Sequence, residues 1–276
     1  MVKCYIDKFD ENGDFMGKII ALVNQKGGVG KTTSSINLAA SLGYLDKKVL
    51  LVDLDPQGNS TTGVGVSKTN YTSSMYELLK DEAELRDVII KTKFKNLYII
   101  PATINLAGID FELSEMQSSD KNFSKGKQLK KYLDQVKDTF DFIIIDCPPS
   151  LGILTTNALT AADSVIIPVQ CEFFALEGIM QLLNTIMMAQ RTLNPTLDIE
   201  GVLLTMLDGR TNLGLEVVEE IKSYFKERVY DTIIPRLVRL SEAPSHGKPI
   251  IAYDSQNRGS EAYLNLAREV IERNGK

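Results

Sequence analysis

The stretch that decides the fold is residues 18–33, which read Lys-Ile-Ile-Ala-Leu-Val-Asn-Gln-Lys-Gly-Gly-Val-Gly-Lys-Thr-Thr. The apolar run at its start predicts a buried β-strand over 18–24, and the residues after the glycines predict a helix over 31–44. Glycine accepts backbone conformations that other residues avoid, so a glycine-rich turn between these elements lets several N–H groups point inward. At the start of a helix, such a turn predicts a binding site for phosphate.

This turn differs from the general phosphate-loop pattern G-x-x-x-x-G-K-[ST] at one position. Gln25 stands where the pattern has its first glycine, while Gly30, Lys31 and Thr32 match its end. We expect the Lys31 amine to reach the β- and γ-phosphates of a nucleotide and the Thr32 hydroxyl to ligate Mg²⁺. A plain glycine-rich turn and an anion site without hydrolysis are the alternatives. The predicted nucleotide-binding residues are Lys26, Gly27, Gly28, Val29, Gly30, Lys31, Thr32 and Thr33.

Outward from this loop, short β-branched runs alternate with longer helical patterns. Several runs are apolar on both faces, as in strands buried in a parallel sheet. The alternation predicts a doubly wound α/β fold, a mostly parallel sheet flanked by helices, whose ligands lie beyond the carboxyl ends of the strands. The other predicted strands are 49–53, 97–101, 142–146, 164–169, 201–206 and 232–235, and the other predicted helices are 125–139, 176–191, 214–226 and 259–273.

Acidic residues follow two of these predicted strands at the edge where the loop lies. Asp53 ends one strand, and on an extended chain its side chain and that of Asp55 point the same way. We expect one of them to orient a water molecule or a water bound to Mg²⁺, with capping of a turn as the alternative. Asp146 closes an apolar run in a Walker B pattern, and we expect it to hold Mg²⁺ through water.

Composition excludes several classes of protein. The 276 residues carry a net charge of −5, unlike a uniformly basic nucleic-acid protein, so any DNA contact must come from a local patch. No apolar run is long enough to span a bilayer, and the charged first residues are unlike a signal peptide. Three scattered cysteines favour a reduced cytoplasm over a disulfide framework. Because no linker divides the chain, we expect an N-terminal extension over 1–16 and a single domain over 17–276.

Several longer stretches carry a resemblance to a known family. They are 24–33, then 53–59, which reads Asp-Leu-Asp-Pro-Gln-Gly-Asn, and 146–152, which reads Asp-Cys-Pro-Pro-Ser-Leu-Gly. On these stretches the sequence resembles the ParA/Soj chromosome-partition ATPases, members of the ParA/MinD superfamily with a deviant Walker A loop. The likeness continues through 168–178 and 239–249 and covers nearly the whole chain. It implies a P-loop fold that uses ATP and Mg²⁺.

The resemblance assigns roles that spacing alone does not. Lys26 is similar to the family's signature lysine, which crosses a dimer interface to the partner's ATP, so a missing glycine at position 25 is expected. Gly27 lies where two loops would approach in a nucleotide-sandwich dimer, and a side chain there should block dimerisation. The resemblance identifies Asp55 as the residue that positions the attacking water, and as a further candidate contact for Mg²⁺, and Asp146 as the Walker B acid. The expected catalytic residues are therefore Lys26, Lys31 and Asp55.

Four basic residues are candidates for contact with DNA. Arg236, Arg239 and Lys248 lie close together in sequence near one acid, Glu242, and Arg210 lies in a predicted loop. A few surface charges are ordinary, and a solvated loop is the alternative. In the Soj-like branch, arginines matching Arg210 and Arg239 are associated with nonspecific DNA binding by the ATP dimer, so the resemblance favours contacts to DNA phosphates.

The implied function is a dimerisation switch in chromosome or plasmid segregation. ATP would drive homodimerisation, and the dimer would bind double-stranded DNA without sequence preference. A ParB-like centromere-binding protein would then stimulate slow hydrolysis of ATP, after which the chains separate and release DNA. The expected location is the cytoplasm, in association with the nucleoid and not with a membrane.

Three alternatives remain open at this point. A MinD-like membrane-site regulator would end in a membrane-binding helix, whereas the last predicted helix carries its apolar positions on a face that fits packing on the core. An iron–sulfur reductase would need two cysteines per chain facing a dimer axis, and neither Cys147 nor Cys171 matches that pattern. A related ATPase that positions another cargo or regulates replication initiation would use the same switch, and the residues do not separate these cargoes.

Overall fold

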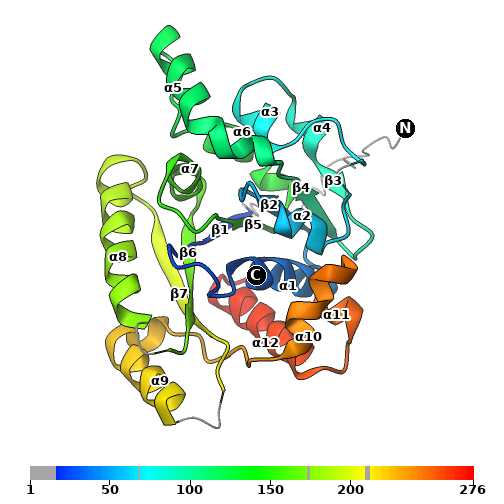
Figure 1. Ribbon diagram of the computed structural model, residues 1–276, viewed down its shortest axis with the longest axis vertical. Helices are drawn as coiled ribbons and strands as arrows, with labels where there is room; N and C mark the ends of the chain where they lie inside the picture. Colours follow the sequence, from blue (N-terminus) through cyan, green and yellow to red (C-terminus); the bar gives the residue numbers. More distant parts are fainter. Residues whose placement is uncertain (1–16, 68, 173–174, 209–211) are drawn as a thin grey trace.

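A central sheet organises the protein, whose computed structural model describes residues 17–67, 69–172, 175–208 and 212–276 (Figure 1). Within these ranges the strand order is β3-β4-β2-β5-β1-β6-β7, and the strands are parallel except for β3, which pairs antiparallel with β4. The strands are β1 Lys18–Leu22, β2 Val49–Asp53, β3 Ile90–Lys91, β4 Leu97–Ile100, β5 Phe142–Asp146, β6 Ser164–Gln170 and β7 Asp198–Thr205. This sheet confirms the predicted α/β class.

Helices cover both faces of the sheet, which confirms the doubly wound arrangement (Figure 1). One apolar cluster joins the sheet to α1, α10, α11 and α12, and a second joins its other face to α3 through α9. The helices are α1 Lys31–Tyr44, α2 Asn59–Gly63, α3 Met75–Leu79, α4 Leu85–Val88, α5 Ile109–Ser119, α6 Gln128–Leu133, α7 Ile153–Ala161, α8 Ala175–Thr192, α9 Asn212–Phe225, α10 Val238–Glu242, α11 Ile250–Tyr253 and α12 Arg258–Arg273, with short 3-10 helices at η1 Ile104–Gly108, η2 Lys137–Thr139, η3 Lys226–Arg228 and η4 Ala243–His246.

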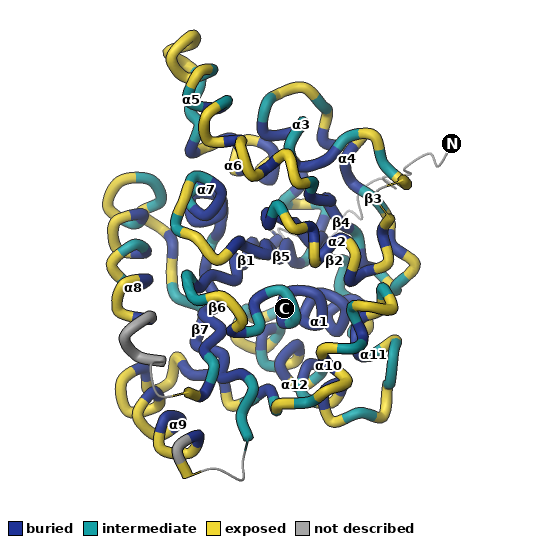
Figure 2. The backbone as a smooth tube through the Cα atoms, in the orientation of Figure 1, coloured by how far each residue is buried: buried dark blue, intermediate teal, exposed yellow. Residues whose placement is uncertain are grey.

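Burial follows from this layering (Figure 2). Every residue of β2 and of β5 is buried, because helices cover both faces and β-branched and leucine side chains fill both sides. The helix α1 is also buried along most of its length, between the sheet and α12. The elements that carry the glycine loop and the acids therefore belong to the most rigid part of the fold.

One predicted strand is absent from the sheet. Residues 232–235 make one isolated bridge, between Leu207 and Pro235, and the Ile234 N–H donates to the Leu204 carbonyl of β7, but no ladder forms. Pro235 has no N–H to donate to a ladder, and the N–H groups of Asp231 and Thr232 donate to the carboxylate of Glu269 instead of to a strand. The segment lies along the end of β7 without forming an eighth strand in the described chain.

One predicted helix is much shorter than expected. Of residues 125–139, only Gln128–Leu133 is α-helical, with a short 3-10 turn at Lys137–Thr139. The buried Asn157 side chain donates to the Lys125 carbonyl and accepts from the Leu129 N–H, which fixes the start of the segment as a turn. Its end tightens through 3-10 hydrogen bonds, so periodicity overestimated its length.

The last helix packs as its apolar face predicts. In α12 the side chains of Tyr263, Leu266, Ala267 and Val270 are buried against the core. None of the helices that the structure describes is long and apolar enough to cross a membrane. The expected extension over 1–16 lies outside the described residues.

Candidate nucleotide-binding site

The glycine loop between β1 and α1 is held by side chains at both ends. Asn24 donates to the Pro168 carbonyl at 2.8 Å and accepts from the Lys26 N–H at 2.9 Å. At the other end the Thr205 hydroxyl donates to the Val29 carbonyl at 2.9 Å. Gly28 and Gly30 have φ of 77° and 85°, a left-handed conformation that favours glycine. The loop is thus preformed, and Gly30 leads directly into the N-terminus of α1.

Lys31 is the buried cation of the loop. Its side chain is almost fully buried, and its amine donates to the Lys26 carbonyl at 3.0 Å, back across the loop. Burial lowers the pKa of Lys31, while the charges of Asp146 and Asp55 work against that shift. The amine therefore lies where a loop-bound phosphate and the two acids would all interact with it.

Asp146 is the last residue of β5, and its carboxylate accepts hydrogen bonds from hydroxyl groups of two helices. Its carboxylate accepts from the Ser35 hydroxyl of α1 at 3.0 Å and from the Ser60 hydroxyl of α2 at 2.8 Å, and Thr32 also donates to it. Burial raises the pKa of Asp146, and these hydroxyl groups oppose the increase. The carboxylate and hydroxyl oxygens together form the kind of donor set that a hard divalent cation prefers.

The two neighbouring acids, Asp53 and Asp55, have different surroundings. Asp53 is fully buried beside Asp146 in the sheet register and accepts three hydrogen bonds, from the Asp55 N–H and from the N–H and hydroxyl of Thr61. Burial, and then the charge of Asp146, raise the pKa of Asp53. Among the described residues, the Asp55 carboxylate accepts from the Gln57 N–H alone, at 2.9 Å.

The expectation that Asp53 and Asp55 point the same way assumed an extended chain through both residues. The alternation of side chains holds only along a strand, and β2 ends at Asp53. Asp55 instead begins a turn in which its carbonyl accepts from the Gly58 N–H. Asp53 is therefore tied into the fold, and Asp55 is the acid of the pair with hydrogen-bonding capacity to spare.

A small cavity lies next to Gly30 and Thr33, at the end of the loop. Its volume is about 130 Å³, and its wall includes Gly30, Thr33 and Met206, together with residues that precede and begin α10. Sequence analysis missed this cavity because its lining is mostly apolar and comes from separate segments. Met206 has φ of 54°, a left-handed conformation for a non-glycine residue, and such strain concentrates at functional positions.

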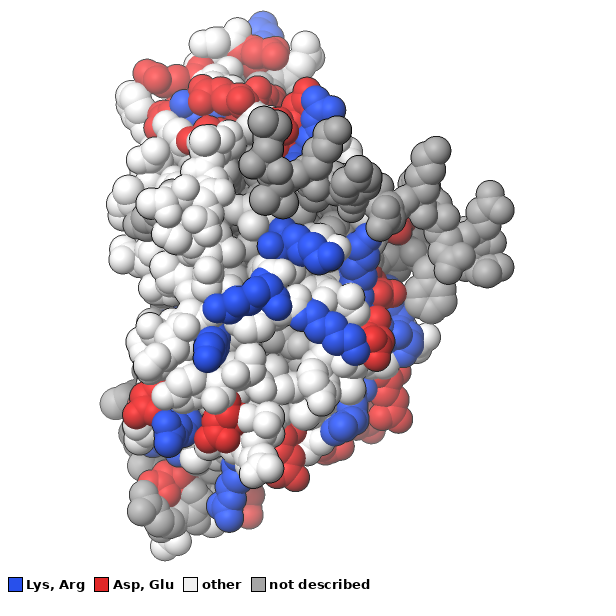
Figure 3. Space-filling view, turned by 90° about the vertical axis from the view of Figure 1, so that its right-hand side faces the viewer, with Lys and Arg blue, Asp and Glu red and all other residues white. Residues whose placement is uncertain are grey.

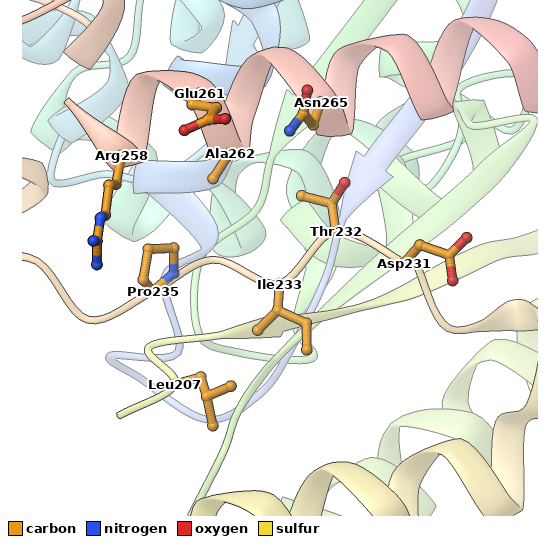
Figure 4. Close-up of a pocket in the computed structure, with 9 residues that line it drawn as sticks. All are labelled: Leu207, Asp231, Thr232, Ile233, Pro235, Arg258, Glu261, Ala262 and Asn265. Atoms are coloured by element: carbon orange, nitrogen blue, oxygen red, sulfur yellow. The ribbon is translucent and has the colours of Figure 1, made fainter. Parts of the chain in front are cut away.

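A larger cavity of about 600 Å³ lies elsewhere, between the extended segment 231–235 and α12 (Figure 4). Arg258, Glu261 and Asn265 project from the helix, opposite Ile233 and Pro235. No residue predicted for the nucleotide site lines it. We therefore place the candidate site by the chemistry of the loop and its acids, and not by the size of the cavity.

Lys26 and Gly27 face outward from the loop. The Lys26 side chain is 41% exposed, and its amine lies 3.9 Å from the carboxylate of Glu172. A Cβ added to Gly27 would meet no atom of the described part of the chain within 4 Å. The loop thus leaves the Lys26 side chain partly exposed to solvent, with unoccupied space beside the Cα atom of Gly27.

The three candidate DNA-binding residues that the structure describes are also exposed. Arg236 pairs with Glu172 at 3.2 Å, Arg239 pairs with Glu242 at 3.3 Å, and Lys248 is exposed. Arg210 lies outside the described residues. Charge is unevenly spread over the surface, as Figure 3 shows for one face, where Lys and Arg gather in the middle and acids gather at the top.

Taken together, these features define a class. A glycine loop between a strand and a helix, a buried lysine at the start of that helix and an acid at the end of a neighbouring strand are the parts of a P-loop nucleotide-binding protein.

Comparison with known proteins identifies the family. A family model described as an AAA domain matches residues 17–199. The chain is 60% identical over 255 residues to the sporulation initiation inhibitor protein Soj of Bacillus subtilis, covering 92% of this chain and 98% of that protein. It is 52% identical to the chromosome-partitioning ATPase Soj of Treponema pallidum, covering 95% of this chain and all of that protein. This chain belongs to the ParA/Soj family of chromosome-partition ATPases.

Solved structures show the same fold. A crystal structure described as cobyrinic acid a,c-diamide synthase from Mycobacterium smegmatis, with bound ATP analog and magnesium, is 34% identical, with a TM-score of 0.79. The match covers 92% of this chain and 94% of that one. The predicted family and the P-loop fold are thereby confirmed, while the roles of individual site residues stay predictions.

Proposed function

We propose that this chain is an ATP-dependent dimerisation switch of chromosome partition, which binds DNA without sequence preference and hydrolyses ATP slowly. The observation that carries this proposal is the convergence of buried Lys31 with Asp55 and Asp146 at a preformed glycine loop. Phosphoryl transfer needs charge neutralisation and positioning more than covalent help, and this set supplies both. The curated relatives named for chromosome partition support the cellular role.

The site fits Mg-ATP. We assign the triphosphate to residues 26–33 and the base to the small cavity beside Gly30 and Thr33. Thr32 would ligate Mg²⁺ directly and Asp146 through water, and the ion would neutralise charge on the phosphates. A related structure that holds an ATP analog and magnesium supports this assignment. Asp55, which keeps an oxygen for another partner, would orient the attacking water.

Lys26 is proposed to complete the site of a second chain. Its amine contacts Glu172 in the single chain, and such an exposed ion pair is worth only about 0–1 kcal/mol, so the amine can leave Glu172 at little cost. Because part of the positive charge would arrive only in the dimer, we expect a single chain to hydrolyse ATP slowly. Gly27 leaves open space where the two loops would meet.

The dimer is proposed to hold duplex DNA through Arg210, Arg236, Arg239 and Lys248. Exposed arginines and lysines contact phosphates without reading bases, and two copies of one surface raise the avidity. Hydrolysis, stimulated by a ParB-like centromere-binding partner, would separate the chains and release the DNA. This cycle would take place in the cytoplasm on the nucleoid.

Size-exclusion chromatography with light scattering tests the switch. Wild type in ADP and in ATP is compared with Asp55→Ala in ATP, each with and without duplex DNA. We expect a stable dimer that carries DNA only for Asp55→Ala in ATP. A nucleotide-independent mass would refute the switch, and a dimer that ignores DNA would leave the switch and refute the DNA-binding role.

A charge reversal tests the DNA surface separately. Arg239→Glu should abolish retention of DNA while ATP-dependent dimerisation persists, because Arg239 lies on α10 and makes no hydrogen bond to the loop. Unchanged DNA retention by this variant would contradict the assignment.

A further inference from the structure

The segment that carries Arg239 is fixed on the nucleotide-binding core. The Ile250 N–H donates to the buried Asn37 side chain of α1 at 2.7 Å. Gly247, with φ of 59°, crosses Gly65 so closely that an added Cβ would lie 2.9 Å from the Gly65 Cα. The backbone of α10, η4 and α11 therefore forms a rigid base, and any mobility of Arg239 lies in its side chain.

Two neighbours hold the Arg239 guanidinium, and they differ in charge. One of its nitrogens lies 3.3 Å from the Glu242 carboxylate and 3.3 Å from the Tyr253 hydroxyl oxygen, and its central carbon lies 5.8 Å from the centre of the Tyr253 ring. Glu242 restrains the arginine but also neutralises it. Tyr253 restrains it and leaves its positive charge available, because a ring face and a hydroxyl carry no net charge.

Tyr253 is itself held in place. Its ring stacks on the ring of His246, with centres 5.0 Å apart and an angle of 23° between the planes. His246 ends η4, and Tyr253 ends α11, where its N–H donates to the Pro249 carbonyl. The stacked pair therefore connects two short helices into a platform under Arg239.

We infer that Tyr253 is a positioning residue that orients the Arg239 guanidinium for contact with a DNA phosphate. This inference rests on the DNA-binding role proposed above. A long, exposed arginine loses much rotamer freedom when it binds, and a partner that restrains it beforehand reduces that loss. Tyr253 would act only through Arg239 and would make no contact with the bases.

The expected size of the effect follows from the contact. An exposed cation–π interaction is worth a factor of about 2–5 in an equilibrium constant, and a dimer presents the pair twice, so its loss should weaken DNA binding about 4- to 25-fold. Tyr253→Phe keeps the ring and the stacking on His246, so it should lose less than Tyr253→Leu.

A double-mutant cycle tests the inference. Tyr253→Leu, Arg239→Gln and the double variant are made in the ATP-trapped Asp55→Ala background, and their affinity for a duplex is measured by fluorescence anisotropy at several salt concentrations. We expect the double variant to bind like Arg239→Gln alone. We also expect Arg239→Gln to reduce the salt slope by about 1.8, since each lost phosphate contact removes about 0.9 and the dimer loses two, whereas Tyr253→Leu, which keeps the charge of Arg239, should reduce the slope by less.

The other outcomes of the cycle separate the positioning role of Tyr253 from the DNA-binding role of Arg239. Additive losses in the cycle would overturn the positioning role and leave the DNA-binding role standing, whereas undiminished binding by Arg239→Gln would overturn the DNA-binding role itself. Tyr224→Leu, which changes an exposed tyrosine on α9, is the control for the loss of a surface tyrosine and should bind DNA like its parent. If Tyr253→Leu does not fold, His246→Ala replaces it in the cycle, because it removes the ring that holds Tyr253 and changes neither Tyr253 nor Arg239.

Discussion

The hydroxyl of Thr61 is the single group whose removal should reveal how the acid cluster is held. Thr61 is buried in α2, and its hydroxyl donates to the Asp53 carboxyl at 2.7 Å and accepts from the Ala102 N–H at 3.1 Å. Thr61→Val keeps the shape of the side chain and removes both hydrogen bonds. We expect this change to destabilise the fold and to leave the glycine loop itself intact.

The magnitude follows from these two bonds. Loss of the bond to Asp53 costs about 1 kcal/mol, and a buried N–H left without an acceptor costs about 1–3 kcal/mol. The free energy of unfolding should therefore fall by about 3 kcal/mol. For a chain of this length, each kcal/mol lost from the free energy of unfolding lowers Tm by about 2–4 °C, so Tm should fall by about 6–12 °C.

The adjacent residue provides the control for this measurement. Thr62 is exposed, and its hydroxyl bonds only to nearby carbonyls of its own turn, so Thr62→Val should stay within about 0.5 kcal/mol of wild type. Urea denaturation of nucleotide-free protein at neutral pH, followed by circular dichroism, compares the two variants. Equal losses in both, or a loss below about 1 kcal/mol in Thr61→Val, would refute this account of how Asp53 is held.

Three further predictions follow from the site and the surface. Gly27→Val should leave Tm within about 2 °C, because the added carbons meet open space in the single chain, and should prevent the ATP-dependent dimer in light scattering. Glu242→Gln should tighten DNA binding in anisotropy assays, since it removes the carboxylate that neutralises Arg239. Burial raises the pKa of Asp53 and of Asp146 above the ordinary 3.8. These acids therefore stabilise the fold most at acid pH, and they lose that contribution as pH rises through their folded pKa values. Asp53→Asn should accordingly flatten the pH dependence of the unfolding free energy.

The central fold was predictable because its strands are apolar on both faces. The predicted bounds of α1, β2 and β5 match the structure, and each is a long buried pattern followed or preceded by glycine or aspartate. The short helices were not predicted, since four or five residues show no period. A local signal existed for α3, where Ser74 and Glu77 form a capping box.

The side chains that hold the acids of the candidate site in place were the hardest part to predict. The loop lysine and the acid after β5 follow from spacing, but Ser35, Ser60 and Thr61 are small hydroxyl residues in helices, which sequence patterns do not distinguish from others. Their role depends on contacts between residues as much as 111 positions apart, such as Ser35 with Asp146. Only the folded sheet brings such pairs together, which is why pattern analysis found the acids and missed the groups that hold them.

The ion pairs on the surface explain how an acidic chain can carry a DNA-binding role. Glu172 contacts both Lys26 and Arg236, and Glu242 contacts Arg239. In the single chain, the three side chains that are proposed to bind phosphates therefore share two carboxylates. Each pair is half-exposed and worth at most about 1 kcal/mol, so the closely spaced charges of DNA phosphates compete well with a single carboxylate. If Lys26 moves to the partner's nucleotide, Glu172 is left to Arg236 alone and neutralises it more fully. Each arginine would then face one carboxylate, and Arg239 has in addition an uncharged partner, the Tyr253 hydroxyl, that restrains its guanidinium without neutralising it.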